Sequence, residues 1–173
     1  GCKVFGITSS AEKVDYLKNN GVDVPIESVN GNYHQQLKEH LGDQMLDVVF
    51  NSVGGATYKK DSAFLNKGGK IILYGVADRL SLSKGVLGTL QLVWKFGFMS
   101  PIKVLINSQS IIGINMLRIA DYKPKTLKRC LEKVVDMTMA GALNPMNGGD
   151  FNVDDIDKAH DFLESRKSVG KVI

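Results

Sequence analysis

Three hydroxyl residues and a lysine follow the first apolar run of the chain: Thr8, Ser9 and Ser10, with Lys13 one helical turn further on. Hydroxyl groups, the free N–H groups at a helix start and an ammonium together suit an anion such as phosphate. In dinucleotide-binding sheets an acid at this position binds a free ribose 2′-hydroxyl, whereas a cation suits a 2′-phosphate. No acid precedes Glu12 here, so the segment favours NADP(H) over NAD(H). The alternative is an ordinary helix cap with a solvated lysine.

Small residues follow two further apolar runs. Residues 51–54 (Asn-Ser-Val-Gly) come after the run 46–50, and residues 75–78 (Gly-Val-Ala-Asp) come after the run 70–74. In open parallel sheets, ligands bind beyond the carboxyl ends of the strands. Small residues at such ends let a flat ligand approach the backbone closely. We therefore expect these two segments to border a ligand site.

The elements that must position these residues alternate along the chain. Apolar β-prone runs and segments of helical periodicity take turns, which predicts an α/β fold with a doubly wound, mostly parallel sheet. We expect the two central strands to be parallel and buried on both faces. A turn is expected at residues 66–69, and the region 79–109 is less regular. The expected strands are 2–8, 24–28, 46–50, 70–74, 110–114 and 169–173, and the expected helices are 11–20, 33–41, 56–65, 125–140 and 152–165.

Composition excludes several classes of protein. The chain has 173 residues, of which 43% are hydrophobic and 23% charged, as in a soluble globular domain. Its net charge of +4 is scattered, without the basic patch that binds nucleic acid. Cys2 and Cys130 stand apart from other metal-ligand residues, which argues against a zinc site and against a disulfide framework. With no signal peptide at the start, we expect a cytoplasmic protein without a metal site.

The most hydrophobic segment covers residues 86–105. The segment is not typical of a membrane-spanning helix, because it is interrupted by Gln91, Lys95, Pro101 and Lys103. Leu87, Leu90, Trp94 and Phe98 fall near one helical face, which we expect to pack as a lid over a cofactor and substrate cleft. Interfacial membrane contact and partner binding are the alternatives. The three histidines, His34, His40 and His160, are expected to be solvated on polar helix faces.

One motif of dinucleotide-binding folds is missing from the sequence. The chain contains no G-x-G-x-x-G, the turn that cradles the pyrophosphate after the first strand. The strand that would precede that turn is missing as well, and in the order 3-2-1-4-5-6 it is central. The expected strands before residue 29 and after residue 45 therefore lack a common neighbour. We expect the sequence to be a piece of a longer chain that is inactive on its own.

Five segments together resemble the zinc-independent quinone oxidoreductase branch of the medium-chain dehydrogenase/reductase superfamily. They are VFGITSSAEKVDYLKNNGVD, LDVVFNSVGG, LNKGGKIILYGVAD, IIGIN and HDFLESRKSVGKVI, in the family's order. YGVADRLS and the Trp-containing stretch after it are most similar to the synaptic-vesicle-membrane-protein type. The resemblance implies an alcohol dehydrogenase-like, C-terminal nucleotide-binding portion. Residues 1–140 would form a partial Rossmann dinucleotide-binding domain, and residues 141–173 a return segment that helps complete the substrate domain.

The resemblance also implies cofactor contacts by position. Ser28 departs from it, because the family commonly has a Tyr there, near the adenosine phosphate. The implied contacts are the 2′-phosphate pocket (Thr8, Ser9, Ser10 and Lys13), the strand end beside the adenosine (Asn51, Ser52 and Val53), the backbone at the nicotinamide ribose (Gly75 and Val76), the strand at the nicotinamide (Ile112, Gly113 and Ile114), and Lys171 in a C-terminal Gly-Lys-Val element.

The implied activity is hydride transfer from NADPH to a quinone or an α,β-unsaturated carbonyl, without catalytic zinc. No catalytic residue is assigned, because a proton donor would come from solvent or from the missing half. Two alternatives are a non-catalytic nucleotide-binding or membrane-surface module and a trans-acting enoyl reductase. Related enzymes look dimeric, so a homodimer through the strand from Ser110 to Ile114 is expected.

Overall fold

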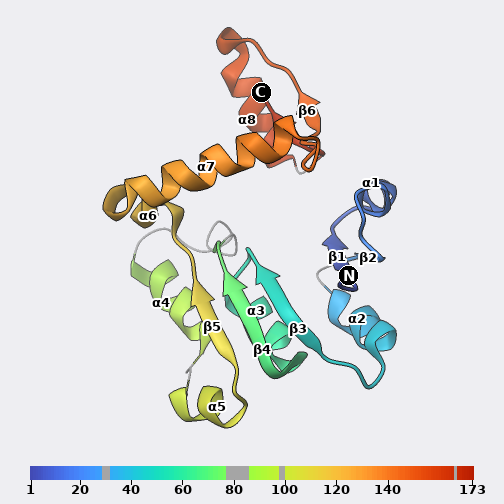
Figure 1. The fold of residues 1–173 in the computed structure, drawn as a ribbon, viewed down its shortest axis with the longest axis vertical. Coiled ribbons are helices and arrows are strands. Elements are labelled where there is room, and N and C mark those ends of the chain that lie inside the picture. The colour runs from blue at the N-terminus through green and yellow to red at the C-terminus, as the bar shows by residue number, and fades with distance from the viewer. Residues whose placement is uncertain (29–31, 77–85, 98–99, 166) are drawn as a thin grey trace. The chain divides into compact units, whose positions relative to one another are not determined.

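The computed structural model describes residues 1–28, 32–76, 86–97, 100–165 and 167–173 (Figure 1). The strands are β1 (Phe5–Thr8), β2 (Val24–Glu27), β3 (Leu46–Asn51), β4 (Leu65–Leu73), β5 (Ser110–Gly113), β6 (Asn147–Gly149) and β7 (Lys171–Val172). The α-helices are α1 (Val14–Asn19), α2 (Tyr33–Leu41), α3 (Gly55–Ala63), α4 (Val86–Phe96), α5 (Pro101–Ile106), α6 (Met116–Tyr122), α7 (Pro124–Met139) and α8 (Ile156–Glu164). Short 3-10 helices cover Ala11–Lys13 and Val153–Asp155.

The chain divides into two compact units. The first is Gly1–Leu117 and the second is Arg118–Ile173. In the second unit, β6 pairs in parallel with β7, and the rings of Phe151 and Phe162 lie 5.8 Å apart. The expected boundary between a dinucleotide-binding domain and a return segment after residue 140 stays a prediction.

The first unit contains two separate parallel sheets. One consists of β1 and β2, and the other has the order β3-β4-β5 (Figure 1). This separation agrees with a sequence that lacks the strand expected between them. The parallel sheets and connecting helices confirm the α/β fold class.

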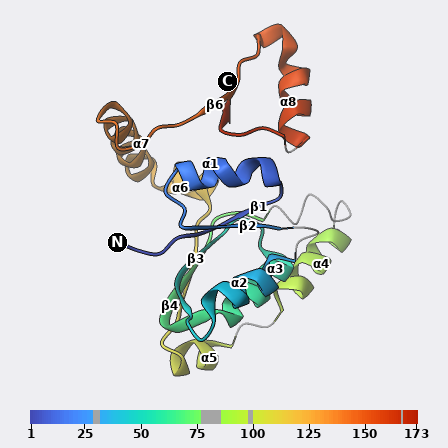
Figure 2. The same cartoon turned by 90° about the vertical axis from the view of Figure 1, so that its right-hand side faces the viewer.

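Helix α2 packs between the two sheets. Its Leu37 and Leu41 are buried against Ile26 of β2, and Leu46 of β3 packs on the same cluster. Figure 2 shows α2 beside α3, and α3 in turn covers one face of the three-stranded sheet. The period-3.6 apolar residues of α2 therefore join the β1–β2 sheet to the rest of the first unit.

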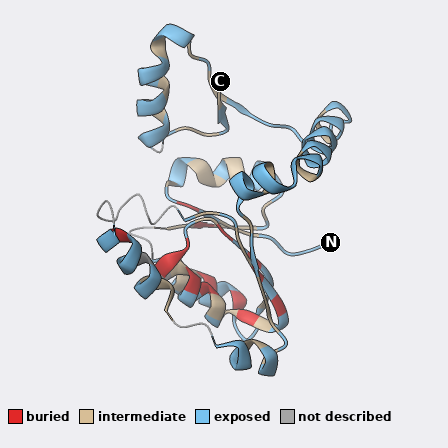
Figure 3. Ribbon diagram, turned by 90° about the vertical axis from the view of Figure 1, so that its left-hand side faces the viewer, coloured by how far each residue is buried: buried red, intermediate tan, exposed pale blue. Residues whose placement is uncertain are grey.

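The core lies under α3. Tyr58 of α3 is buried with Val49 of β3 and with Leu65 and Ile71 of β4. Figure 3 shows the buried residues gathered in elements of the first unit. Burial on both faces was expected for β3, but Phe50 on its other face is 70% exposed. Successive side chains of a strand alternate between faces, and no described element of this chain covers the second one.

Strand β4 is longer than expected. The turn predicted at residues 66–69 lies within β4, as a bulge between two paired segments. Leu65 pairs with Leu46 and Lys70 with Val48, so the extra residues of β4 bulge out of the ladder. Gly68 supplies the positive φ of 78° that this bulge needs, and its N–H donates to the carbonyl of Asn107. Local turn chemistry was identified correctly, but the strand continues on both sides of it.

The region expected to be irregular contains α4 and α5. Phe96, which is not among the residues predicted to form the lid face, contacts the core, with its ring 5.6 Å from that of Tyr58. Leu87, Leu90 and Trp94 are exposed, and Phe98 lies outside the described residues. The predicted packing of that helical face is therefore not found.

Candidate functional site

The carboxyl ends of three strands meet at one edge of the sheet. Asn51 of β3 pairs in register with Leu73 of β4, which pairs with Gly113 of β5. The N–H of Ile114 donates to the carbonyl of Leu73 at 2.8 Å, which extends the alignment beyond β5. One residue earlier, Ile112 pairs with Ile72. The structure thus brings together the predicted site residues of β3, β4 and β5.

The backbones of the first two strands touch just beyond their ends. A Cβ atom built on Gly75 would lie 2.5 Å from the carbonyl oxygen of Ser52, so only glycine fits there. Gly54, with φ of 72°, faces the same contact from the β3 side. A Cβ atom built on it would lie 3.4 Å from the carbonyl oxygen of Gly75 and 2.8 Å from the ring of Phe96. Two glycines therefore set the spacing of this edge.

Exposed apolar side chains line the same edge. Val53, Val76 and Ile112 are 40%, 46% and 39% exposed, respectively. Gly113 lies among them, and a Cβ there would meet no atom within 4 Å. An apolar, open surface at the strand ends suits a flat ring. Ala77 and Asp78, expected at the end of β4, lie outside the described residues.

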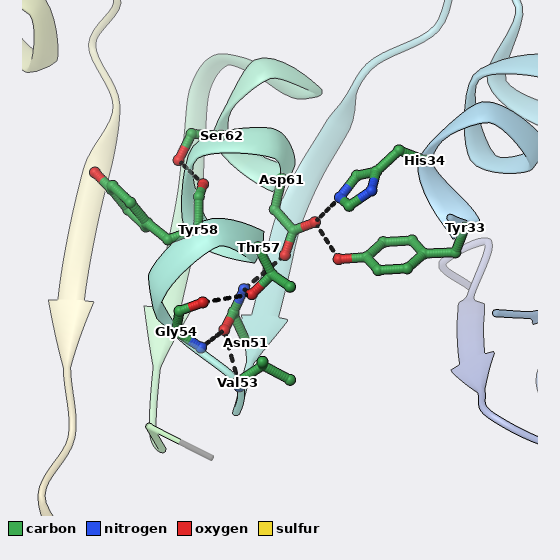
Figure 4. A network of polar contacts seen from close by, with 9 residues as sticks. All are labelled: Tyr33, His34, Asn51, Val53, Gly54, Thr57, Tyr58, Asp61 and Ser62. Atoms are coloured by element: carbon green, nitrogen blue, oxygen red, sulfur yellow. Dashed lines mark hydrogen bonds and ion pairs between the residues drawn. The ribbon is translucent and has the colours of Figure 1, made fainter. Parts of the chain in front are cut away.

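The side chain of Asn51 organises the turn after β3 (Figure 4). Its Oδ1 accepts hydrogen bonds from the N–H of Gly54 at 2.7 Å and of Val53 at 3.1 Å. Its Nδ2 donates to Asp61 Oδ2 at 2.6 Å and to Thr57 Oγ1 at 3.0 Å. The Thr57 hydroxyl in turn donates to the carbonyl of Gly54 at 2.7 Å. Asn51 is 4% exposed, and its bonds with Asp61 and with the Gly54 N–H are buried, so they fix the turn.

The carboxylate of Asp61 accepts hydrogen bonds from three side chains on two elements, β3 and α2. Besides Asn51, it accepts hydrogen bonds from the Tyr33 hydroxyl at 2.7 Å and from His34 Nε2 at 3.1 Å. Asp61 is 7% exposed. Burying a carboxylate costs free energy unless it is hydrogen-bonded, and these three donors offset that cost. Burial, with Asp61 as the second cause, raises the pKa of Tyr33 far above its usual value.

His34 was expected to be solvated, and that prediction is wrong. Its side chain is 11% exposed, stacks on the ring of Tyr33 and contacts Asp61. Burial lowers the pKa of His34, and the nearby Lys60 lowers it further, while Asp61 opposes the shift. The neutral ring donates through Nε2, and its buried Nδ1 has no partner among the described residues.

The predicted phosphate segment follows β1. Thr8 is buried at the end of the strand, its hydroxyl lies 3.3 Å from the carbonyl oxygen of Ser10, and Ser9 is exposed. Ser10 precedes the 3-10 helix that contains Lys13, but no side-chain hydrogen bond caps that helix. The expected side-chain cap therefore does not form, and the hydroxyl of Thr8 lies against the Ser10 backbone.

Lys171 lies in the second unit. It pairs with Asn147 in the β6–β7 sheet and is exposed. Its predicted contact with the cofactor stays a prediction.

The polar side chains beneath the end of β3 were not predicted as site residues from the sequence. Asp61 and Thr57 are four residues apart, so α3 places both on the face toward Asn51. That spacing was a local signal for Asp61. Tyr33 and His34 had no such signal, because their contact joins residues 27 and 28 positions apart.

Metal-binding clusters and membrane-spanning helices are both absent from the described residues. Ranges 1–28, 32–76, 86–97, 100–165 and 167–173 contain no group of three or more His, Cys, Asp or Glu residues placed to hold a metal ion. The same ranges contain no helix that is both long and apolar enough to cross a membrane.

Comparison with known proteins matches these elements to one family. A family model described as zinc-binding dehydrogenase matches residues 1–132. The synaptic vesicle membrane protein VAT-1 homolog of Danio rerio is 25% identical over 171 residues, which are 98% of this chain and 35% of that protein. Prostaglandin reductase-3 of Bos taurus is 28% identical over 191 residues, which cover 99% of this chain and 45% of that protein.

Solved structures show the same fold. A mycobacterial protein complexed with NADPH superposes with a TM-score of 0.69 and 23% identity, over 98% of this chain and 49% of that one. The chain spans less than half the length of each of these relatives. These similarities confirm the medium-chain dehydrogenase/reductase resemblance and its nucleotide-binding portion.

Proposed function

This chain belongs to the zinc-binding dehydrogenase family, and we propose that it is the cofactor-binding portion of an NADPH-dependent oxidoreductase that reduces a quinone or an α,β-unsaturated carbonyl. The observation that carries the proposal is the edge where β3, β4 and β5 end together. There Asn51, Leu73 and Gly113 stand in register, with exposed Val53 and Ile112 beside them.

The residues at this edge fit a nicotinamide dinucleotide. The open space over Gly113 and the exposed apolar side chains suit the flat adenine and nicotinamide rings. Ser9, Ser10 and Lys13 supply hydroxyl and ammonium groups for a 2′-phosphate, while the buried Thr8 holds the Ser10 backbone beside them. The pyrophosphate-binding G-x-G-x-x-G motif is not part of this sequence.

When bound, NADPH supplies the hydride for reduction of the substrate. The residues of this chain hold the cofactor and fix its position at the strand ends. Asn51 keeps the turn after β3 in one shape, and Gly75 lets the end of β4 approach that turn. The homodimer through β5 and the cytoplasmic location belong to the same proposal.

The test measures the affinities for NADPH and NADH of the wild-type chain and of Lys13→Ala. Losing one charge-assisted hydrogen bond costs roughly 1.5–3 kcal/mol, or about a tenfold to hundredfold rise in Kd for NADPH. The Kd for NADH should stay within about twofold, since NADH lacks the 2′-phosphate.

Lys18→Ala is the matched control. Lys18 is an exposed lysine on α1 whose ammonium lies 3.8 Å from Asp15. It should leave both affinities unchanged. Equal losses for NADPH and NADH in Lys13→Ala would contradict the phosphate-pocket assignment, and no binding of either cofactor by the wild type would contradict the proposed function.

A further inference from the structure

Asp61 lies beneath the proposed cofactor edge without belonging to it. It is 7% exposed, and the residues predicted to contact the cofactor do not include it. Three of its hydrogen-bond donors come from two parts of the chain: Asn51 at the end of β3, and Tyr33 and His34 at the start of α2. A buried carboxylate only accepts hydrogen bonds, so it dictates which group of each neighbour faces it.

For Asn51 that choice decides the shape of the turn. An asparagine side chain can present either its carbonyl oxygen or its NH₂ group to a neighbour. Asp61 Oδ2, 2.6 Å away, holds the NH₂ group, which leaves Oδ1 to accept from the N–H groups of Val53 and Gly54. With Asn51 reversed, its NH₂ group would face those two N–H donors.

The same carboxylate connects the two sheets. Tyr33 and His34 begin α2, and Gln36 of that helix donates to the carbonyl of Glu27 at the end of β2. The next residue, Ser28, donates its N–H to the carbonyl of Thr8 at 2.6 Å. A hydrogen-bonded route thus runs from the predicted phosphate segment through α2 and Asp61 to the turn after β3.

We propose that Asp61 is a positioning residue of the cofactor site: it orients Asn51, and through α2 it holds the turn after β3 in place relative to the phosphate segment after β1. The proposal rests on the proposed function, because it assigns Asp61 to NADPH binding. Asp61 acts through Asn51 and makes no contact with the cofactor itself.

The test compares Asp61→Ala with Asp61→Asn, in the full 173-residue chain. An asparagine at this position can present its oxygen to the NH₂ group of Asn51. Its own NH₂ group can then donate to the Tyr33 hydroxyl oxygen and to Nε2 of His34, in the tautomer that carries its proton on Nδ1. Asp61→Asn should therefore keep Asn51 oriented, and Asp61→Ala should release it. Ser62→Ala is the matched control on α3, since among the described residues the Ser62 hydroxyl donates to the Tyr58 carbonyl and takes no part in the contacts of Asp61.

Two readouts separate positioning from stability. The first is the NADPH dissociation constant, measured where unfolding curves show each variant to be folded. The second is the hydrogen-exchange rate of the Gly54 amide, resolved by NMR, relative to amides of the core. We expect Asp61→Ala to raise the Kd and the Gly54 exchange rate at least tenfold each, and Asp61→Asn and Ser62→Ala to change both less than threefold.

Each contrary outcome has a distinct meaning. If the Asp61→Ala variant folds and binds NADPH with the wild-type Kd, Asp61 has a structural role only and the proposal is wrong. Asp61→Asn as impaired as Asp61→Ala would show that orientation of Asn51 is not the cause. Failure of the wild type to bind NADPH would overturn the proposed function. The assignment of Asp61 to the cofactor site would then be overturned as well. The Gly54 exchange rate would still report whether Asp61 holds the turn, which keeps the two failures distinguishable.

Discussion

Replacing Gly75 by alanine tests the close approach of β3 and β4 directly. The new Cβ would lie 2.5 Å from the carbonyl oxygen of Ser52, and 3.2 and 3.3 Å from its carbonyl carbon and Cα. All three are backbone atoms, so no side chain can turn aside. An ordinary contact needs about 3.4 Å, and the strand ends must therefore separate by about 0.9 Å. Overpacking of this kind costs about 1–3 kcal/mol.

Gly113→Ala is the matched control for stability. Its Cβ would meet no atom within 4 Å, and both glycines follow or end neighbouring strands. Each substitution raises the free energy of unfolding by about 0.4–1 kcal/mol, because alanine restricts the unfolded chain, and this contribution cancels when the two variants are compared. Gly75→Ala should be less stable than Gly113→Ala by about 1–3 kcal/mol, equal to the overpacking cost alone.

Urea unfolding followed by circular dichroism measures this difference, provided that the slope m is the same for both variants. NADPH binding supplies a second measurement, because a shift of the strand end of nearly 1 Å displaces groups that hold the cofactor. Equal stabilities of the two variants would refute the described contact between Gly75 and the Ser52 backbone.

Two further predictions concern the network of Figure 4. The lowered pKa of His34 means that the folded protein binds its proton less readily than the unfolded chain does. Its stabilising effect is therefore present above the ordinary pKa of 6.5 and is lost as the pH falls through the lower folded-state pKa. His34→Gln should flatten this decline in a series of urea midpoints between pH 7 and pH 5, and an unchanged slope would assign the decline to other groups. Asn51→Ala removes a donor from the buried carboxylate of Asp61 and the acceptor of the Gly54 N–H, which should cost about 3–5 kcal/mol by the same unfolding measurement. A cost below about 1 kcal/mol would contradict the network.

Local patterns predicted the elements whose signals lie within one segment. Leu37 and Leu41, followed by Gly42, predicted the bounds of α2, and the apolar spacing of 125–140 predicted α7 to within one residue at each end. The apolar runs 46–50 and 110–114 predicted the ends of β3 and β5 to within one residue of the observed ends at Asn51 and Gly113. These signals suffice because helix periodicity and turn residues act over a few positions.

Features that depend on distant parts of the chain were missed. His34 was predicted to lie on a polar face of α2. Its contact with Asp61 forms when α2 packs against α3, which the local pattern does not show. The bulge in β4 depends on pairing with β3 and on the bond from Gly68 to Asn107. The exposed face of β3 was likewise beyond the pattern, because an apolar run does not reveal which of its faces is covered.

The edge of β3 that no described strand pairs with bears on the tendency of the chain to self-associate. Within the described residues β3 pairs only with β4, so its other edge presents backbone N–H and C=O groups beside exposed Val48 and Phe50. Such an edge is a template on which further strands add. Asp47, at the start of the strand, opposes parallel stacking of identical copies in register, since like charges would face each other. Concentrated solutions of this chain should therefore self-associate through β3 more readily as salt screens Asp47.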